Sequence, residues 1–347
     1  MKLAIIFGAN SYEHEVSIVS AITLKRLLRG LIFIFIDARR EFYLIDEKDM
    51  KANFFSSYTY KKCPKLSLSH GGFKTQGLFS KKIDANIYLN LVHGQDGEDG
   101  KLPALFEFFD LAYIGPNIPA SVLSYDKELS KSYASSCGVK TLYCEVLRSK
   151  EEAYKLSLPF IIKPARLGSS IGISVIEDKN QIDYAMDVAM EFDSKIIAEP
   201  FIKNLREFNL AGFWDGEKLV FSMLEEVKKE GFLDFEQKYL DFTQKKIEPA
   251  AVEAPLLEKF HEAFRRIYDP LFRGALIRCD FFLIDGEVFL NEINPNPGSL
   301  ANYLFDDFKG AVESLAKAAK TKSKIKINYA FINELSHAKG GKNYQKD

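Results

Sequence analysis

The sequence predicts an α/β (α+β) protein built from more than one domain. The chain has 347 residues, which exceeds the length that one hydrophobic core commonly serves. Its beginning alternates strand, helix and strand, and its later segments pair as β-hairpins. Hydrophobic residues make up 47% and charged residues 27% of the chain, as in a soluble globular protein. The formal net charge of −1 would attract neither nucleic acid nor a membrane surface, so we expect neither as a partner.

The N-terminal residues have the pattern of a βαβ unit. An apolar strand is expected over 2–7, an amphipathic helix over 17–28 and a second apolar strand over 31–36. Gly8 ends the first strand and Gly30 closes the helix. The unit lacks the G-x-G-x-x-G fingerprint, so a dinucleotide is not expected there.

A third apolar strand is expected over 83–92, and the glycine-rich run HGQDGEDG follows it at 93–100. Glycines let backbone amides approach a ligand closely. Ligands bind at the carboxyl ends of the strands in open α/β sheets. We therefore expect the loops after Phe7 and Val92 to be neighbours over one site.

The pattern changes after residue 117, where strands become short and hairpin-like. The expected strands are 143–147, 159–164, 173–177, 195–198, 207–213 and 218–224, and the expected helices are 126–137, 252–268 and 306–320. The stretch 228–249 has no clean period. Loops of that length usually have a function, so we expect a lid there. The tail after Thr321 is basic and is expected to be frayed.

A lysine and a glycine- and serine-rich loop indicate a phosphate site. Lys163 lies on the apolar strand 159–164, and the loop 165–172 (ARLGSSIG) follows it. The lysine supplies a point charge and the loop supplies backbone donors. An ordinary hairpin with a flexible tip would have the same pattern. The acidic segment farther along the chain favours the phosphate site.

The most informative segment is 278–298, RCDFFLIDGEVFLNEINPNPG. Arg278 and Asp280 are two residues apart on one apolar strand, and Glu292 and Asn294 are two residues apart on the next, so each pair shares a face. Buried charges are costly unless they are paired or bind metal. Hard oxygen ligands suit Mg²⁺ shared with substrate phosphates. The segment therefore predicts a magnesium–nucleotide site on a hairpin. The alternative is a hairpin whose charged side chains face water, and the many apolar residues of the segment argue against it.

The register of this hairpin can be predicted from its length. A two-residue turn at Asp285-Gly286 would place Asn291 opposite Asp280. A three-residue loop, or one bulge, would instead set the two polar pairs opposite each other, with Glu292 facing Asp280. We expect the loop, with Gly286 in a left-handed conformation.

Taken together, these motifs resemble those of a known family. The order of KPxxxGSS at 163–170, EPFI at 199–202, RxD at 278–280 and NEINPxPG at 291–298 is similar to that of the ATP-grasp enzymes. The flanking motifs, EHEVS at 13–17, HGxxGEDG at 93–100 and KY at 238–239, resemble the D-alanine–D-alanine ligase family. The resemblance covers residues 1 to about 320, and it is specific because separate motifs agree in order and spacing.

The resemblance implies an N-terminal Rossmann-like parallel-sheet domain followed by a two-lobed ATP-grasp domain. The implied division is 1–115 for an N-terminal substrate-binding domain, 116–200 for the central ATP-grasp subdomain, 201–325 for the C-terminal subdomain with the Mg site, and 326–347 for a flexible tail.

The resemblance also implies ATP as co-substrate with two Mg²⁺ (or Mn²⁺) ions. Lys127, Lys163 and Ser170 match the groups that hold the phosphates. The positions matching the adenine and ribose site are Glu199, Ile202, Glu207 and Phe282, and the metal ligands are Asp280, Glu292 and Asn294. One extra residue lies between Glu199 and Glu207, so the ribose assignment can slip.

The expected substrate groups come from distant parts of the chain. Glu13 matches the residue that engages the ammonium of the first D-alanine, in a hydrogen-bonded set with Ser169 and Tyr239, and His93 lies near that substrate. By the pattern of the family that the chain resembles, tyrosine rather than phenylalanine at 239 implies a dipeptide product rather than a depsipeptide with D-lactate. The oxyanion donors are Arg278 and the Gly298 amide, and Lys238 belongs to the closing loop. The serine that often binds the second substrate's carboxylate is replaced by Tyr303, so either Ser299 or Tyr303 fills that role.

The implied function is ATP-dependent ligation of two D-alanines through an acyl phosphate, with release of ADP and phosphate, for peptidoglycan precursor synthesis. The cysteines at 63, 137, 144 and 279 form no CxxC pair and follow no signal peptide, so a cytoplasmic setting is expected. A homodimer is expected as well. Another ATP-grasp ligase would need a different loop at 13–17, and a regulatory module without turnover would not need an intact metal set.

Overall fold

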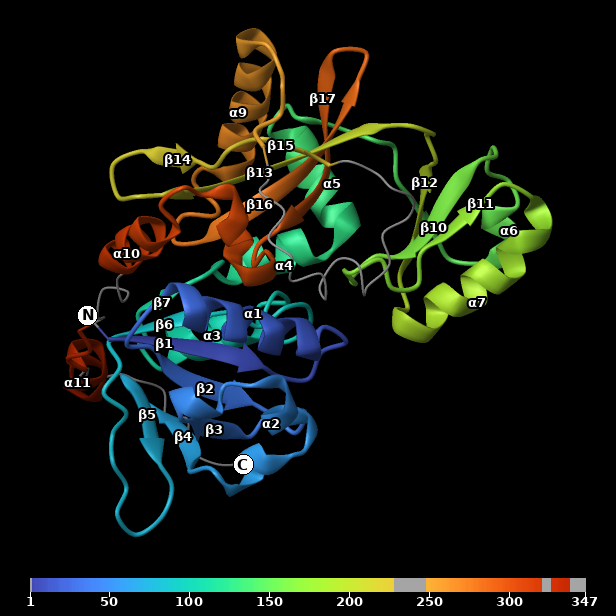
Figure 1. The fold of residues 1–347 in the computed structure, drawn as a ribbon. Coiled ribbons are helices and arrows are strands. Elements are labelled where there is room, and N and C mark those ends of the chain that lie inside the picture. The colour runs from blue at the N-terminus through green and yellow to red at the C-terminus, as the bar shows by residue number, and fades with distance from the viewer. Residues whose placement is uncertain (1, 228–247, 320–325, 338–347) are drawn as a thin grey trace.

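The structure of the protein is a computed structural model that describes residues 2–227, 248–319 and 326–337, and it has a mixed α/β architecture. Within these residues the strands form three sheets, which Figure 1 shows as three bodies: a seven-stranded sheet below, a six-stranded sheet above it and a four-stranded sheet to one side.

The seven-stranded sheet has the order β5-β4-β3-β2-β1-β6-β7. Its strands are β1 (Leu3–Gly8), β2 (Ile32–Ile36), β3 (Phe42–Ile45), β4 (Lys65–Ser69), β5 (Gly72–Thr75), β6 (Ile87–Asn90) and β7 (Tyr113–Ile114). Strands β2, β1, β6 and β7 are parallel, and β3, β4 and β5 extend the sheet in antiparallel fashion. Every residue of β1 is buried, as the unbroken apolar run of a central parallel strand requires.

The predicted βαβ unit is confirmed, with two differences in the strands that follow. The strand predicted over 83–92 is shorter, because only β6 pairs with β1 there. The antiparallel strands β3 to β5 were not predicted. All three are short, and β4 and β5 also mix polar with apolar residues, so their periodicity is weak. The helices of this part are α1 (His14–Leu27), α2 (Ala52–Ser56) and α3 (Lys101–Phe108), with 3-10 turns η1 (Glu47–Asp49) and η2 (Thr59–Lys62).

The four-stranded sheet is antiparallel, with the order β11-β10-β12-β9. It consists of β9 (Glu145–Leu147), β10 (Phe160–Pro164), β11 (Ser174–Ile176) and β12 (Ile196–Pro200), with α6 (Lys150–Ala153), η3 (Lys179–Gln181) and α7 (Ile182–Phe192). Its core is its own, because residues such as Ile162, Met186 and Ile196 pack only with others from this lobe.

The third sheet has the order β14-β13-β16-β17-β8, and β15 also pairs with β13. Its elements are β8 (Lys140–Thr141), β13 (Arg206–Trp214), β14 (Leu219–Phe221), β15 (Glu225–Val227), β16 (Leu276–Ile284) and β17 (Glu287–Asn294). Helices α4 (Ile118–Tyr125), α5 (Lys127–Ser136) and α9 (Ala254–Tyr268) contribute to its core.

The hairpin of β16 and β17 has the predicted face-to-face register, reached in a different way. Asp280 is opposite Glu292, as expected. The expected three-residue loop is wrong, because Ile284 pairs with Glu287 across a two-residue turn. Both turn residues are left-handed, with φ of 49° at Asp285 and 75° at Gly286, which suits a type I′ hairpin. The register then shifts between Asp280 and Phe281, and this bulge turns Glu292 to the face of Asp280.

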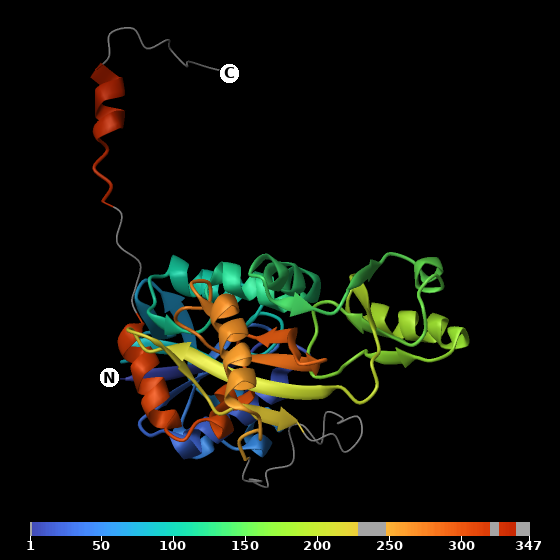
Figure 2. The same ribbon diagram turned by 90° about the horizontal axis from the view of Figure 1, so that it is seen from above.

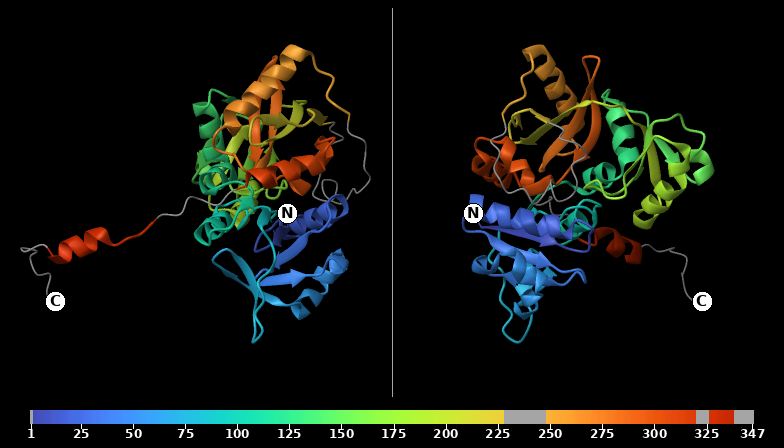
Figure 3. Two further views of the ribbon diagram at one scale, coloured as in Figure 1. Left: turned by 90° about the vertical axis from the view of Figure 1, so that its left-hand side faces the viewer. Right: turned by 45° about the vertical axis from the view of Figure 1, so that its right-hand side comes forward.

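The first and third sheets are joined by a shared core. The segment η4 (Gly298–Leu304) and the helix α10 (Phe308–Ala318) follow β17 and pack onto α1 and β7. Their side chains Leu300, Leu304 and Leu315 belong to the same cluster as Phe7 and Leu24. Figure 3 shows η4 and α10 in red directly above α1 in blue.

Part of the tail is helical rather than frayed. Helix α11 (Ala330–His337) lies within it and stands away from the other described residues (Figure 2). No helix among the described residues has the length and apolar character needed to cross a membrane.

Candidate functional site

The loops after β1 and β6 lie side by side, as predicted. Ser17 at the start of α1 donates to the carbonyl of Leu91 at 2.6 Å, and the amide of Asn10 donates to Asp96 Oδ2 at 3.2 Å. Arg40, from the turn between β2 and β3, forms a two-point ion pair with the buried Asp96 carboxylate at 2.9 and 3.1 Å. Asp96 therefore ties both loops to the edge of the first sheet.

Glu13 meets the glycine- and serine-rich loop of the four-stranded lobe. Its carboxylate is buried and accepts a hydrogen bond from the Ser169 hydroxyl at 2.5 Å. A Cβ atom at Gly94 would lie 2.6 Å from Glu13 Oε2, and one at Gly168 would lie 2.9 Å from Glu13 Oε1. A side chain at either glycine would therefore crowd the Glu13 carboxylate in this position. Residues 13 and 169 were predicted to meet, and that prediction is confirmed.

His93 holds together two further segments. Its Nδ1 lies 2.8 Å from the Asn296 carbonyl and its Nε2 lies 2.9 Å from the Ser20 hydroxyl. A carbonyl can only accept, so Nδ1 carries the proton and Nε2 accepts from Ser20. Burial lowers the pKa of His93 to about 4, so the ring is neutral. Ser20 in turn accepts from the amide of Ser299 at 2.9 Å, which completes a link from the first sheet to η4.

That link supports a strained turn. Ser299, Leu300 and Ala301 are left-handed, with φ of 48°, 53° and 47°. Such residues cost on the order of 1–2 kcal/mol each. Leu300 and Ala301 are fully buried, so packing offsets part of that cost. The turn begins at Gly298, the expected oxyanion donor, so the strained backbone directly follows that residue.

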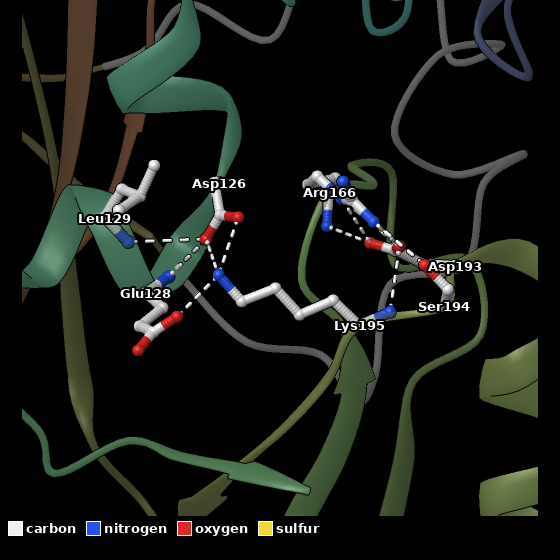
Figure 4. Close-up of polar contacts among 7 residues, drawn as sticks. All are labelled: Asp126, Glu128, Leu129, Arg166, Asp193, Ser194 and Lys195. Atoms are coloured by element: carbon white, nitrogen blue, oxygen red, sulfur yellow. Dashed lines mark hydrogen bonds and ion pairs between the residues drawn. The ribbon is translucent and has the colours of Figure 1, made fainter. Parts of the chain in front are cut away.

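Two carboxylates anchor the base of the glycine- and serine-rich loop (Figure 4). Asp193 accepts from the Arg166 amide at 2.8 Å and pairs with the Arg166 guanidinium. Asp126 caps α5 and receives the Lys195 ammonium at 2.9 and 2.8 Å. Lys195 also pairs with Glu128 at 2.5 Å. The start of α5 is thus tied to the lobe that carries the loop.

Lys127 reaches the same loop from the other side. Its amide donates to the Ala165 carbonyl at 3.0 Å and its ammonium donates to the Leu167 carbonyl at 2.6 Å. Burial lowers the pKa of Lys127, with nearby Lys163 acting in the same direction and Glu292 opposing it. A cavity of about 40 Å³ lies beside it, lined by Lys127, Gly168, Glu292 and Asn294 among others.

Lys163 lies on β10 as predicted, and its ammonium pairs with Glu199 on β12 at 2.8 Å. A second lysine, Lys131 on α5, lies 3.2 Å from the other oxygen of Glu199. Burial acts to raise the pKa of Glu199, but the two lysines outweigh burial and the pKa falls below its usual value. The sequence therefore located two members of a three-residue buried cluster.

Arg278, Asp280 and Asn294 form a connected polar set on β16 and β17. Arg278 donates to both oxygens of Asp280 at 2.7 and 2.9 Å, and Asn294 Nδ2 donates to Asp280 Oδ2 at 3.0 Å. Burial raises the pKa of Asp280 above its usual value; Arg278 opposes that rise and the Glu292 carboxylate adds to it. Two carboxylates are therefore held together against their mutual repulsion.

This donor set fits the expected Mg²⁺. Asp280 and Glu292 on facing strand positions, with the Asn294 amide beside them, offer the hard oxygen ligands that Mg²⁺ prefers. Among the described residues no three His, Cys, Asp or Glu side chains converge as a metal site. The set is thus two carboxylates and an amide, which suits an ion that takes its remaining ligands from phosphates and water.

The expected nucleotide positions on the other strands are partly brought together. Glu207 on β13 is directly opposite Phe282 on β16. Ile202 follows β12 and is 38% exposed. Of the two candidates for the second carboxylate, the Tyr303 hydroxyl lies 3.5 Å from Arg278 Nη1 and 3.4 Å from Glu225. Residues 238 and 239, and the expected lid over 228–249 up to residue 247, lie outside the described residues.

Sequence reasoning missed three residues of the site. Glu98 lies in the 93–100 run, and burial raises its pKa well above the usual value, with the Glu13 carboxylate adding to the rise. Its position in a glycine-rich loop after a strand could have identified Glu98 as a candidate site residue. Asp96 in the same loop had the same signal. Lys131 lies one helical turn after Lys127 on α5. The only sequence feature that could have identified it is this spacing, which places both lysines on one face of the helix.

Comparisons with known proteins agree with this geometry. Two family models match the chain: "D-ala D-ala ligase N-terminus" over residues 2–116 and "D-ala D-ala ligase C-terminus" over residues 139–308. Over 343 residues the chain is 55% identical to the D-alanine–D-alanine ligase of Campylobacter concisus, which covers 98% of this chain and 99% of that protein.

Solved structures of similar proteins have the same fold. The D-alanine–D-alanine ligase of Helicobacter pylori is 44% identical with a TM-score of 0.84, and the match covers 93% of this chain and 100% of that one. The VanG D-Ala:D-Ser ligase of Enterococcus faecalis is 27% identical with a TM-score of 0.76, covering 91% and 98%.

Proposed function

The chain belongs to the D-alanine–D-alanine ligase family, and on that premise we propose how its own residues join two D-alanines. The activity is the ATP-dependent formation of D-alanyl-D-alanine for peptidoglycan synthesis, carried out on an ATP-grasp fold. ATP and a divalent cation, Mg²⁺ or Mn²⁺, take part.

The observation that carries the proposal is the contact between Glu13 and Ser169. It brings the buried carboxylate of Glu13, at the start of α1, to the loop that follows Lys163. We place the first D-alanine there, with its ammonium on Glu13 and its carboxylate toward the phosphates. Ser169 fixes the orientation of Glu13, and His93 supports the neighbouring backbone. Tyr239 completes this set in the proposal.

The nucleotide is proposed to lie between the second and third sheets. Lys127, Lys163 and Ser170 hold the phosphates, and each lies on the loop 165–172 or beside it. Glu199 and Ile202 read the adenine edge, while Glu207 and Phe282, which face each other across β13 and β16, hold the ribose and the base.

Asp280, Glu292 and Asn294 would hold the divalent cations. Cations bound there would neutralise negative charge on phosphate oxygens. This chain contributes by keeping two carboxylates together, with Arg278 and Asn294 as the groups that stabilise Asp280.

The chemistry proceeds in two steps. The carboxylate of the first D-alanine attacks the γ-phosphorus, the bond to the bridging oxygen breaks, and ADP leaves. The amine of the second D-alanine then attacks the acyl phosphate carbonyl, phosphate leaves, and the amine loses a proton, which phosphate can take. Both steps build negative charge on oxygen, which Arg278 and the Gly298 amide are proposed to stabilise. Lys238 belongs to the loop that excludes water from the acyl phosphate.

The second D-alanine is proposed to bind beside η4. The Tyr303 hydroxyl, next to Arg278, is favoured over Ser299 as the group that holds its carboxylate. Ser299 is favoured less because its backbone amide is hydrogen-bonded to the Ser20 hydroxyl on α1.

The test is ADP release by the purified protein with Mg²⁺. We expect ADP and phosphate only when ATP and D-alanine are both present, and D-alanine to exceed D-serine and D-lactate as second substrate. Glu13→Gln should lower kcat/KM for D-alanine by roughly 100-fold or more, since it removes a charged contact made to the reacting substrate. Equal turnover of L-alanine would overturn the assignment.

Three further features belong to the same proposal. We propose a homodimer, a cytoplasmic enzyme and the division of the chain at residues 115, 200 and 325. Four free cysteines support a reducing compartment. Light scattering during size-exclusion chromatography would decide the assembly, because a monomer mass at working concentration would exclude the dimer.

A further inference from the structure

Lys131 is a buried cation that the proposed reaction does not use. Its side chain is 5% exposed, and it faces Glu199, whose side chain is 3% exposed. Lys131 Nζ and Glu199 Oε1 are 3.2 Å apart, yet among the described residues they are two of the few buried polar side-chain atoms without an aligned hydrogen bond. The two groups therefore form a buried ion pair without an aligned hydrogen bond.

One carboxylate serves two lysines in this cluster. Glu199 binds Lys163 through Oε2 and lies against Lys131 through Oε1. Burial lowers the pKa of Lys131, and Lys163 adds to that effect while Glu199 opposes it. The cluster thus contains two lysines and one carboxylate.

In the proposed complex Lys163 binds the phosphates and no longer pairs with Glu199. Glu199 would then be a buried carboxylate whose partner had left, and such a group is costly unless another charge compensates it. Lys131 is in place to be that charge. Its backbone lies on α5, one turn after Lys127, so it stays with the body of the protein while Lys163 engages ATP.

We propose that Lys131 is a specificity-determining residue that keeps Glu199 ionised and facing the purine after Lys163 has moved to the phosphates. The inference rests on the proposed placement of adenine at Glu199. An ionised carboxylate can only accept a hydrogen bond. It therefore accepts from the amino group of adenine and repels the carbonyl oxygen that guanine presents at the same position.

Loss of Lys131 makes this discrimination depend on pH. The titratable groups around Glu199 are Lys163, Lys131, Lys127 and the thiol of Cys144. Without Lys131, and with Lys163 on the phosphates, the carboxylate takes up a proton more readily. A protonated carboxyl has an O–H that can donate to the guanine oxygen. GTP should then become usable, most of all at acidic pH.

The experiment compares kcat/KM for ATP and for GTP, with D-alanine and Mg²⁺ in excess, at acidic and alkaline pH. Lys131→Met should lower the ATP-to-GTP ratio by roughly tenfold or more, the effect of one hydrogen bond to a charged group. The ratio should fall further at acidic pH. Lys131→Gln should lower the ratio by a similar factor. Lys131→Arg should lower it less, because arginine keeps the positive charge.

A control variant lies in the four-stranded lobe, which also carries Glu199. Lys150 pairs with Asp187 at 2.7 Å and is more exposed, so Lys150→Met should leave the ratio and its pH profile unchanged. An equal rise in KM for both nucleotides at every pH in Lys131→Met would overturn the inference, because it would make Lys131 a phosphate ligand.

A second background separates this inference from the proposed adenine site. Glu199→Gln should itself lower the ATP-to-GTP ratio, and adding Lys131→Met to it should then change the ratio little. An unchanged ratio in Glu199→Gln would remove the adenine placement. If Lys131→Met lowers the ratio as much in the Glu199→Gln protein as in the unchanged protein, Lys131 does not act through Glu199. The proposed role of Lys131 would then be wrong, while the adenine placement would stand.

Discussion

At the scale of single residues, the buried imidazole of His93 links the site to stability in acid. Its pKa in the folded protein is about 4, against an ordinary value of 6.5. Between these values the unfolded chain binds a proton that the folded protein does not. The contribution of the neutral His93 ring to the free energy of unfolding is therefore fully present above about pH 6.5. It is lost as the pH falls toward about 4, and the loss is roughly 3 kcal/mol in total.

We expect His93→Gln to flatten this acid dependence. Urea unfolding measured across that pH range should lose up to about 1.4 kcal/mol per pH unit of slope relative to the unchanged protein. Comparing the two proteins isolates His93 from Glu98 and Asp280, whose raised pKa values act in the opposite sense. His70→Gln is the matched control, because that side chain is 69% exposed. A slope in His93→Gln equal to that of the control would contradict the buried neutral ring.

The residues that the sequence predicted well share a simple cause. Asp280, Glu292 and Asn294 could be placed on one face because strand periodicity is local. Lys163 could be placed because its strand is short and apolar. Glu98 and Lys131 could not, because their partners come from other elements, and burial next to Glu13 or Glu199 depends on how the sheets meet.

At the scale of elements, the hairpin of β16 and β17 illustrates what length alone can decide. The count of residues required one irregularity if Asp280 was to face Glu292. The count could not say whether the extra residue lies in the turn or in a bulge, because both change the register by one residue. Asp285 can adopt a left-handed conformation beside Gly286, so the two-residue turn survives and the irregularity moves into β17.

The ion pairs at the start of α5 predict how the phosphate loop is positioned. Lys195→Met removes the link between Asp126 and the lobe that carries residues 165–172. We expect KM for ATP to rise roughly tenfold with a smaller change in kcat, because the loop loses its fixed position while the phosphate-binding groups remain. Steady-state kinetics with varied ATP measures this split.

Two companion variants test the cause. Asp126→Asn keeps the helix cap, since Asn caps as well as Asp, and removes the charge, so it should raise KM less than Lys195→Met, because Lys195 still pairs with Glu128. Lys203→Met breaks an exposed ion pair with Glu177 in the same lobe and should have none. A normal KM for ATP in Lys195→Met would show that the loop is positioned without this link.

At the scale of the whole molecule, cores and proposed domains do not coincide everywhere. Helices α4 and α5 pack into the core of the third sheet, although they precede the four-stranded lobe in the chain. The turn η4 and α10 pack with the first sheet. The sequence predicted the order of elements, since each pattern is local. It could not predict these exchanges, because they depend on which apolar faces remain uncovered once the sheets have formed.

The distribution of cores predicts which part of the molecule opens first. The four-stranded lobe has a separate and smaller core, whereas the first and third sheets share one through η4 and α10. Local opening follows such cooperative units. Hydrogen exchange should therefore be faster in β10, β12 and α7 than in β1 and β16, and bound ADP with Mg²⁺ should slow it in the lobe.

A pair of matched substitutions tests this division. Ala185→Gly in α7 and Ala21→Gly in α1 remove the same methyl group from fully buried helix positions, each at a cost of about 1 kcal/mol or more. Ala185→Gly should lower protection only within the lobe. Ala21→Gly should lower it in β1 and in η4 together, because α1 packs against both. Equal loss of protection in β1 and β12 for either variant would mean that the molecule opens as a single unit, and the lobe would then have no independent motion with which to admit ATP.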